Sequence, residues 1–137
     1  MRASNGLARN VARWALAALL VFTGTVHFVR TSSFFGQLPS WTPARSAVIW
    51  VSGAVEIAIG LALALSPARW RATVGRALAV LFVLVFPANV YQAIAGTDAF
   101  GLDSPAARWI RLLFQPVLVL WALWASGAWP RRGTEPT

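Results

Sequence analysis

The 137-residue chain has no cysteine and no lysine, one histidine, and one methionine, which is Met1. Without cysteine, the chain cannot relay disulfides, hold an iron–sulfur cluster or form a thiolate intermediate. A single histidine excludes a haem ligated by two histidines of one chain. A closed zinc site needs four ligands, so we expect no metal site. These absences leave proton-coupled work, ligand binding and partner contact as classes of function.

Acidic residues are also scarce, because four of them stand against twelve arginines and give a net charge of +8. This balance suits a nucleic-acid-binding surface when the basic residues gather on one face of a folded domain. Here the arginines are divided among five short segments, and 58% of the chain is hydrophobic. We therefore expect no nucleic-acid partner.

Four stretches are almost free of charge, and each approaches the ~20 residues that an α-helix needs to cross a bilayer core. They cover residues 14–29, 46–65, 77–95 and 112–129. Fifteen of the sixteen charged residues lie outside them. The stretches also lack the polar stripe of a soluble helical bundle. The sequence predicts an all-α membrane protein, a bundle of four transmembrane helices with the lipid bilayer as a partner.

We expect residues 1–10 and 130–137 to be tails and residues 11–129 to form one membrane domain. The predicted spans are about 11–30, 44–65, 74–95 and 106–129. Three helix starts are marked by a hydroxyl as N-cap and a proline as first helical residue. They are Thr42-Pro43, Ser66-Pro67 and Ser104-Pro105. The apolar first connection, residues 31–42, is expected to lie in the membrane interface or to fold over the bundle.

The distribution of arginine predicts the orientation of the chain. Eight arginines lie in the two tails and the second connection, and four lie in the first and third connections. Because short cytoplasmic segments are enriched in basic residues, we expect both termini in the cytoplasm. The expected location is the plasma (inner) membrane of a bacterium, as a multi-pass protein.

Glu56 is the one charged residue inside a charge-poor stretch, and it lies near the middle of its predicted span. A charge at the bilayer centre costs about 2.5–3.5 kcal/mol on insertion scales, so its side chain should face the bundle interior. Ser52, Gly53 and Gly60 share its helix face by their spacing. Small residues let a neighbouring helix approach closely, and we predict that Glu56 points inward along this face.

The other predicted helices carry polar residues at comparable depths. These are His27, then Asn89 and Gln92 after Pro87, and then Arg111 and Gln115. Because successive helices alternate in direction, all of these groups fall in the half of the bundle away from the termini. We predict a polar cavity there, closed by apolar residues towards the termini and either open or covered by the first connection. The alternative is a hydrogen-bond network that only fixes helix packing.

Several short motifs follow one another along the chain. They are Thr25-Val26-His27-Phe28, Leu38-Pro39, Ser52-Gly53-x-x-Glu56 with Gly60, Arg69-x-Arg71, Phe86-Pro87-Ala88-Asn89, and Arg111-x-x-x-Gln115 with Leu120-Trp121-Ala122. In this order and spacing, residues 11–129 resemble the DoxX-like family of small four-helix integral membrane proteins. The resemblance implies an association with membrane oxidoreductases, since the family takes its name from a subunit associated with thiosulfate:quinone oxidoreductase. The chain departs from the family's pattern at Pro116, which follows Gln115 instead of preceding it.

Our functional hypothesis is an accessory subunit, not catalytic on its own, that binds a small molecule from the outer side and supports a membrane redox enzyme. The candidate ligands are a quinone, a sulfur acid or an organic acid, and a quinone is the candidate cofactor. Glu56 would carry a proton or anchor the ligand, His27 would exchange protons, and Arg111 would attract an anionic head group. Asn89 and Gln115 would orient the ligand, with support from Ser52, Gly53, Pro87 and Gln92. A small-solute or proton transporter and a non-catalytic scaffold are the alternatives, and redox subunits or a second copy are the candidate partners.

Overall fold

The computed structural model describes residues 2–99 and 103–129 of the chain. Within these ranges it contains four α-helices, one 3-10 helix and no strand. The elements are α1 (Arg2–Val29), η1 (Thr31–Gln37), α2 (Arg45–Leu65), α3 (Ala68–Ala95) and α4 (Pro105–Ser126). All four α-helices are long and apolar enough to cross a membrane. The predicted all-α fold with four membrane-length helices is confirmed.

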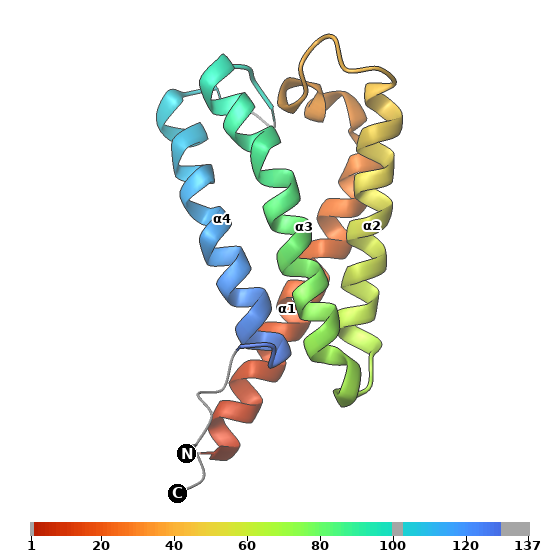
Figure 1. Ribbon diagram of the computed structural model, residues 1–137, viewed down its shortest axis with the longest axis vertical. Helices are drawn as coiled ribbons and strands as arrows, with labels where there is room; N and C mark the ends of the chain where they lie inside the picture. Colours follow the sequence, from red (N-terminus) through yellow and green to blue (C-terminus); the bar gives the residue numbers. More distant parts are fainter. Residues whose placement is uncertain (1, 100–102, 130–137) are drawn as a thin grey trace, which may run out of the picture.

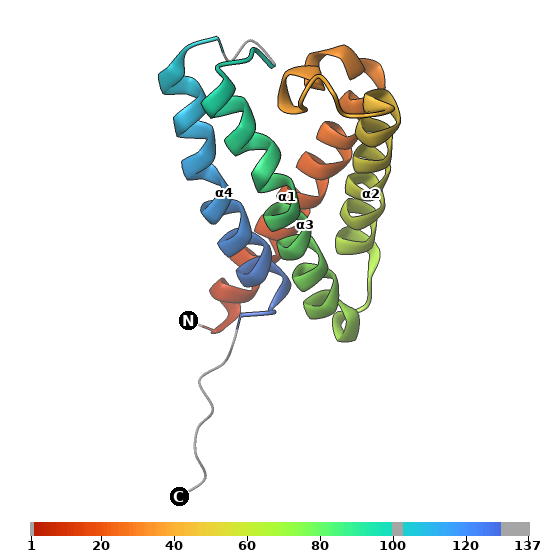
Figure 2. The same ribbon diagram turned by 45° about the horizontal axis from the view of Figure 1, so that its top comes forward.

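The four helices form two antiparallel pairs. α1 packs mainly on α2, and α3 packs mainly on α4, with fewer contacts between the pairs. The pairs cross near the end that holds the N-terminus and lie apart towards the opposite end, where η1 sits (Figures 1 and 2). This divergence decides where a cavity can form.

Glycines set the close approach of α1 and α2. A Cβ atom built on Gly53 would lie 2.6 Å from the Cβ of His27 and 2.7 Å from the main-chain oxygen of Gly24. A Cβ atom on Gly60 would lie 3.0 Å from the Cβ of Leu20. The predicted small-residue face of α2 is therefore confirmed as the face that meets α1.

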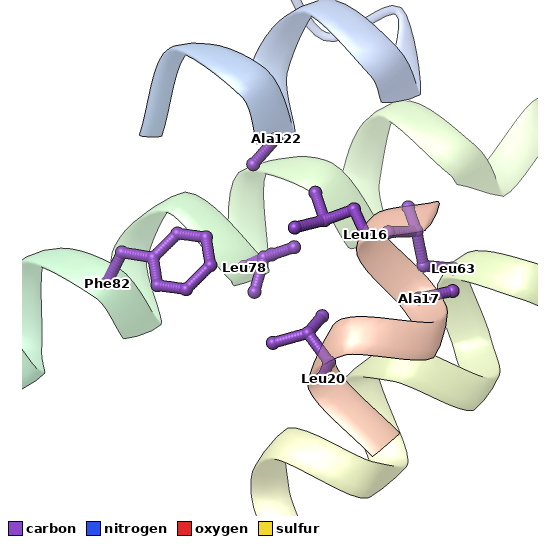
Figure 3. Packing of buried hydrophobic residues seen from close by; sticks show 7 residues of the cluster. All are labelled: Leu16, Ala17, Leu20, Leu63, Leu78, Phe82 and Ala122. Atoms are coloured by element: carbon purple, nitrogen blue, oxygen red, sulfur yellow. The ribbon is translucent and has the colours of Figure 1, made fainter. Parts of the chain in front are cut away.

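An apolar core fills the crossing point of the two pairs (Figure 3). Its buried members come from all four α-helices: Leu16, Ala17, Leu20, Leu63, Leu78, Phe82 and Ala122. It contains no polar side chain. This agrees with the expectation that apolar residues close the bundle towards the termini.

Arg13 is the buried cation at the same end. Its guanidinium donates to the main-chain oxygens of Leu63 at 2.7 Å and Ala64 at 2.8 Å, and to Asn10 Oδ1 at 2.6 Å. The carbonyls at the C-terminal end of a helix have no partner within the helix and attract cations. Arg13 therefore caps the C-terminal end of α2.

Two helix starts differ from the sequence prediction. α1 begins at Arg2, so residues 2–10 continue the helix where a tail was expected. α2 begins at Arg45 after Ala44, whose φ of 48° is left-handed, and no side chain caps it. The expected Thr42 cap is therefore wrong, because the chain leaves the first connection by a left-handed turn instead.

The other two helices also differ in part from the prediction. α3 begins at Ala68, in agreement with the start near Pro67 that the sequence predicts, but no side chain caps it. Its N-cap is Pro67, so the expected Ser66 cap is also wrong. At α4 the predicted cap is confirmed, because Ser104 Oγ accepts a hydrogen bond from the main-chain nitrogen of Ala107. α4 ends at Ser126 because Gly127 adopts a φ of 80°, and residues 130–137 lie outside the described residues.

Candidate functional site

A cavity of about 840 Å³ lies between the two helix pairs, beneath η1. Cavities that bind small molecules typically measure about 300–1,000 Å³ and are lined mainly by apolar side chains with a few polar groups. The walls here follow that pattern and come from all four α-helices and η1. The polar and charged lining residues are Thr23, His27, Arg30, Gln37, Ser52, Glu56, Asn89, Arg111 and Gln115.

The five principal candidates from the sequence lie together at this cavity. They are His27, Glu56, Asn89, Arg111 and Gln115, and each helix contributes at least one of them. Of the supporting residues, Ser52 also lines the cavity, whereas Gly53, Pro87 and Gln92 do not. Gly53 lies at the contact of α2 with α1, and Pro87 lies inside α3. Gln92 is buried beside Arg111.

Glu56, Thr23 and His27 form one polar cluster. Thr23 Oγ1 lies 2.9 Å from Glu56 Oε2 and 3.3 Å from the main-chain oxygen of Leu20. With an ionised Glu56, the hydroxyl donates to the carboxylate. With a protonated Glu56, the carboxyl donates to Thr23 Oγ1, which then donates to Leu20. The same geometry therefore satisfies both protonation states of the carboxyl.

His27 is held in one tautomer by the backbone. Its Nδ1 lies 2.8 Å from the main-chain oxygen of Thr23, which can only accept a hydrogen bond. Nδ1 therefore carries a proton in both the neutral and the cationic ring, and a gained proton goes to Nε2. Nδ1 also lies 3.6 Å from Glu56 Oε2. A protonated His27 is thus close enough to form an ion pair with Glu56.

Phe34 of η1 fixes the plane of the histidine ring. The two rings stack with their centroids 3.9 Å apart and an interplanar angle of 26°, and both residues are buried. In addition, Thr31 Oγ1 donates to the main-chain oxygen of His27 at 2.9 Å. The first connection therefore folds over the bundle as a lid on the cavity, one of the two placements expected from its apolar sequence.

Arg111 joins the lid to α3 and α4. With the amide oxygen of Gln37 turned towards the guanidinium, that oxygen accepts from Nη1 and Nη2 at 2.8 Å each. Nη1 also donates to Gln92 Oε1 at 3.1 Å. Arg111 and Glu56 attract each other electrostatically. The guanidinium therefore holds the lid and α3 together by hydrogen bonds and also places a positive charge at the cavity.

The two amides at the cavity have different surroundings. Gln115 Nε2 donates to the main-chain oxygen of Phe82 at 3.4 Å. Asn89 is buried and lines the cavity, and no hydrogen bond within the described part of the chain engages its side chain. Asn89 is therefore the amide that can offer both a donor and an acceptor to a bound molecule.

The connection between α3 and α4 contacts both η1 and the first turn of α4. Thr97 Oγ1 donates to the main-chain oxygen of Gly36. Arg108 Nη2 lies 3.0 Å from Asp98 Oδ1 and 2.9 Å from the main-chain oxygen of Asp103. The lid and the α3–α4 connection thus contact one another above the cavity.

Several members of this site could not be assigned from the sequence alone. Phe34 and Gln37 lie in the first connection, whose apolar character was visible but whose contacts were not. Thr23 lies one turn before His27 on the same face of α1, and this spacing indicates that the two residues are neighbours at the site. As for metal ions, no group of three His, Asp or Glu residues gathers in ranges 2–99 and 103–129. His27 and Glu56 supply two possible ligands.

A family model described as a domain of unknown function (DUF8561) matches residues 16–126, and the chain belongs to this family. The matched segment includes all five principal site residues. No curated protein matches the chain, and no solved structure matches it.

Proposed function

We propose that this member of the family binds a small molecule in the cavity and acts as an accessory subunit of a membrane oxidoreductase, without catalysing a reaction itself. The observation that carries the proposal is the convergence of His27, Glu56, Asn89, Arg111 and Gln115 on one cavity with otherwise mostly apolar walls. The resemblance to the DoxX-like family supports the link to redox partners. A quinone is the ligand that we favour.

A quinone suits the chemistry of the lining. Its ring carries carbonyl oxygens, which accept hydrogen bonds when oxidised and become hydroxyls that also donate when reduced. The Asn89 amide can meet either form. Glu56 and His27 can each hold a proton beside the ring, and Thr23 hydrogen-bonds to the carboxyl in either protonation state. The walls match an apolar ring and tail.

The same proposal includes an orientation. We place both termini in the cytoplasm of a bacterium and the lid on the outer side of its plasma membrane. The support is the excess of arginines near the termini and the second connection, eight against four. The redox enzyme would contact the bundle or the lid as a separate subunit.

A packing role for the polar residues is the second candidate. It is favoured by Gln115 and Arg111, whose side chains hydrogen-bond to protein groups. It does not account for the cavity beside Glu56 and Asn89. The transporter alternative is disfavoured by the apolar core, which fills the bundle between the cavity and the termini.

The test is ligand binding by the full chain in lipid nanodiscs, with decylubiquinone as the probe and binding followed by the shift in unfolding temperature. We expect Glu56→Gln and Asn89→Ala each to weaken binding about tenfold, the equivalent of ~1.4 kcal/mol for one lost polar contact. Asp103→Asn is the matched control, since Asp103 is exposed and does not line the cavity. Equal binding by wild type, Glu56→Gln and Asn89→Ala would remove the cavity as the ligand site.

The cellular arm uses the same substitution. If loss of the gene gives a respiratory phenotype, Glu56→Gln should fail to restore growth while Asp103→Asn restores it. Copurification from native membranes then identifies the redox subunit. Full complementation by Glu56→Gln would contradict the proton or anchor role.

A further inference from the structure

The cavity is covered at the η1 end. Phe34 lies over His27, and the Gln37 side chain meets Arg111. Thr97 binds the lid backbone at Gly36. These contacts come from α1, from α4 and from the connection between α3 and α4, so the lid is fastened on both sides of the gap between the helix pairs. A molecule entering from water along the bundle axis would have to break several of them.

The opposite end is closed by packing. The apolar core joins all four helices directly below the cavity, and its Leu20 and Phe82 also line the cavity floor. Leu16, Leu63 and Leu78 of the same core are almost fully buried. An apolar core therefore lies between the cavity and the termini.

The sides of the cavity are different, because several of its lining residues are also exposed on the outer surface of the bundle. On α1 and α4, Phe22 is 67% exposed and Phe114 is 57% exposed. On α2 and α3, Val48 is 44% exposed and Leu84 is 70% exposed. A side chain that both lines a cavity and faces outward stands at its rim. These four residues do so between the helices, and the exposed Arg30 does so beside the lid. All four lie within the membrane-length helices, so these openings face hydrocarbon.

The charges at the cavity favour an uncharged head group. Arg111 supplies a positive charge at the cavity, and Glu56 adds a negative charge there when its carboxyl is ionised. Donors of Arg111 are engaged by Gln37 and Gln92. An anionic head beside Glu56 would add a second negative charge at a site of low dielectric, where like charges repel strongly. A neutral head with hydrogen-bonding groups can use Asn89 and Ser52 without this cost.

We propose that the cavity is loaded sideways from the bilayer by a membrane-dissolved amphiphile that has an uncharged, hydrogen-bonding head and an apolar tail. The head lies among His27, Glu56 and Asn89, and the tail leaves between α1 and α4 or between α2 and α3. The proposal rests on the proposed function in taking this cavity as the ligand site. It refines the sequence-based expectation of binding from the outer side by proposing entry from lipid.

The absence of cysteine permits a clean labelling test. Ser52→Cys places one thiol at the cavity, and Ser40→Cys places one on the exposed first connection as a control. Each variant is reconstituted in nanodiscs, which leave both membrane faces accessible. It is then treated with a charged, water-soluble methanethiosulfonate or with N-dodecylmaleimide dissolved in the lipid. Denatured samples report the total reactive thiol.

We expect N-dodecylmaleimide to label both variants, and the aqueous reagent to label Ser52→Cys at least about tenfold more slowly than Ser40→Cys, a difference of ~1.4 kcal/mol in barrier height. Obstructing both side openings with Leu84→Trp and Phe114→Trp should slow the lipid reagent at Ser52→Cys by about the same factor. Val83→Trp with Leu113→Trp is the matched control, because these neighbours are exposed but do not line the cavity.

A second arm tests the head group by protection. Decylubiquinone should slow labelling of Ser52→Cys by N-dodecylmaleimide, and dodecyl phosphate at the same mole fraction should not. Stronger protection by dodecyl phosphate would overturn the uncharged head. Aqueous labelling of Ser52→Cys as fast as that of Ser40→Cys, or no labelling of the folded variant by either reagent, would overturn lateral entry. Lipid-side labelling without protection by decylubiquinone would leave lateral entry standing and count against the quinone.

Discussion

The contact between α1 and α2 gives the sharpest stability prediction, through Gly53→Ala. The added Cβ would meet the Cβ of His27 at 2.6 Å and the main-chain oxygen of Gly24 at 2.7 Å. Real Cβ contacts lie beyond 3.0 Å, so the two helices must move apart by several tenths of an ångström. Neither neighbouring atom lies at the end of a flexible side chain, so rotation cannot relieve the overlap.

The magnitude follows from two opposing terms. Overpacking of a close contact costs about 1–3 kcal/mol, whereas alanine gains about 0.8–1.0 kcal/mol over glycine in a helix interior. The net expectation for Gly53→Ala is a loss of about 0–2 kcal/mol in the free energy of unfolding. Gly6→Ala on α1 is the matched control, because its Cβ would meet nothing within 4 Å. This control should be neutral or slightly stabilising.

The assay is reversible unfolding of both variants in mixed micelles, monitored by circular dichroism. The structure also predicts a local effect, since separation of the helices displaces His27 from Glu56, whose Nδ1 and Oε2 atoms lie 3.6 Å apart. Binding of decylubiquinone should therefore weaken in Gly53→Ala and stay unchanged in Gly6→Ala. A Gly53→Ala protein as stable as Gly6→Ala would refute the reasoning that these glycines limit the approach of the helices.

Three further predictions concern other parts of the bundle. Arg13→Met should lower the free energy of unfolding by at least ~1.5 kcal/mol, the scale of a lost charge-assisted hydrogen bond. Arg69→Met is the control at an exposed position and should change this free energy little. Chemical denaturation measures both variants. Ser104→Ala removes the side-chain N-cap of α4 and should cost about 1 kcal/mol, with faster hydrogen exchange confined to the first turn of α4. Phe34→Ala should loosen the lid and raise aqueous labelling of Ser52→Cys several-fold, and unchanged labelling would mean that the ring stack does not hold the lid.

The sequence determined the helices well because charge is so unevenly distributed in it. Fifteen of sixteen charged residues lie outside the apolar stretches. Because a charge in hydrocarbon is costly, each charge-poor stretch predicts one membrane-spanning helix. Helix ends were harder. Ser104 caps α4 as its local sequence indicates, but Thr42 does not cap α2, because Ala44 adopts the left-handed conformation before that helix. A backbone conformation imposed by the fold of the first connection leaves no local signature.

For the candidate site, the sequence predicted only the level of its residues along the bundle axis. The positions of His27, Glu56 and Asn89 along alternating helices place them at one level, and they do line a common cavity. Which of these side chains hydrogen-bond to other groups of the chain depends on the tertiary structure. Gln37 engages Arg111 from the first connection, and Thr23 reaches Glu56 from the neighbouring helix. Neither pairing follows from spacing along one helix, which is the only geometry that a single sequence supplies.

The apolar core and the polar cavity are two consequences of one crossing. Small residues such as Gly60 bring α1 and α2 together near the core, and the pairs are then free to separate towards η1 (Figure 1). Where they separate, the polar groups of the cavity lie in the gap, and the lid covers them at the η1 end. The half-buried carboxyl of Glu56 therefore depends on the divergence of the helices, and the lid covers the His27 ring beside it. If this is right, Phe34→Ala should impair ligand binding more than Gly60→Ala does, although Gly60→Ala disturbs the core and should lower stability more.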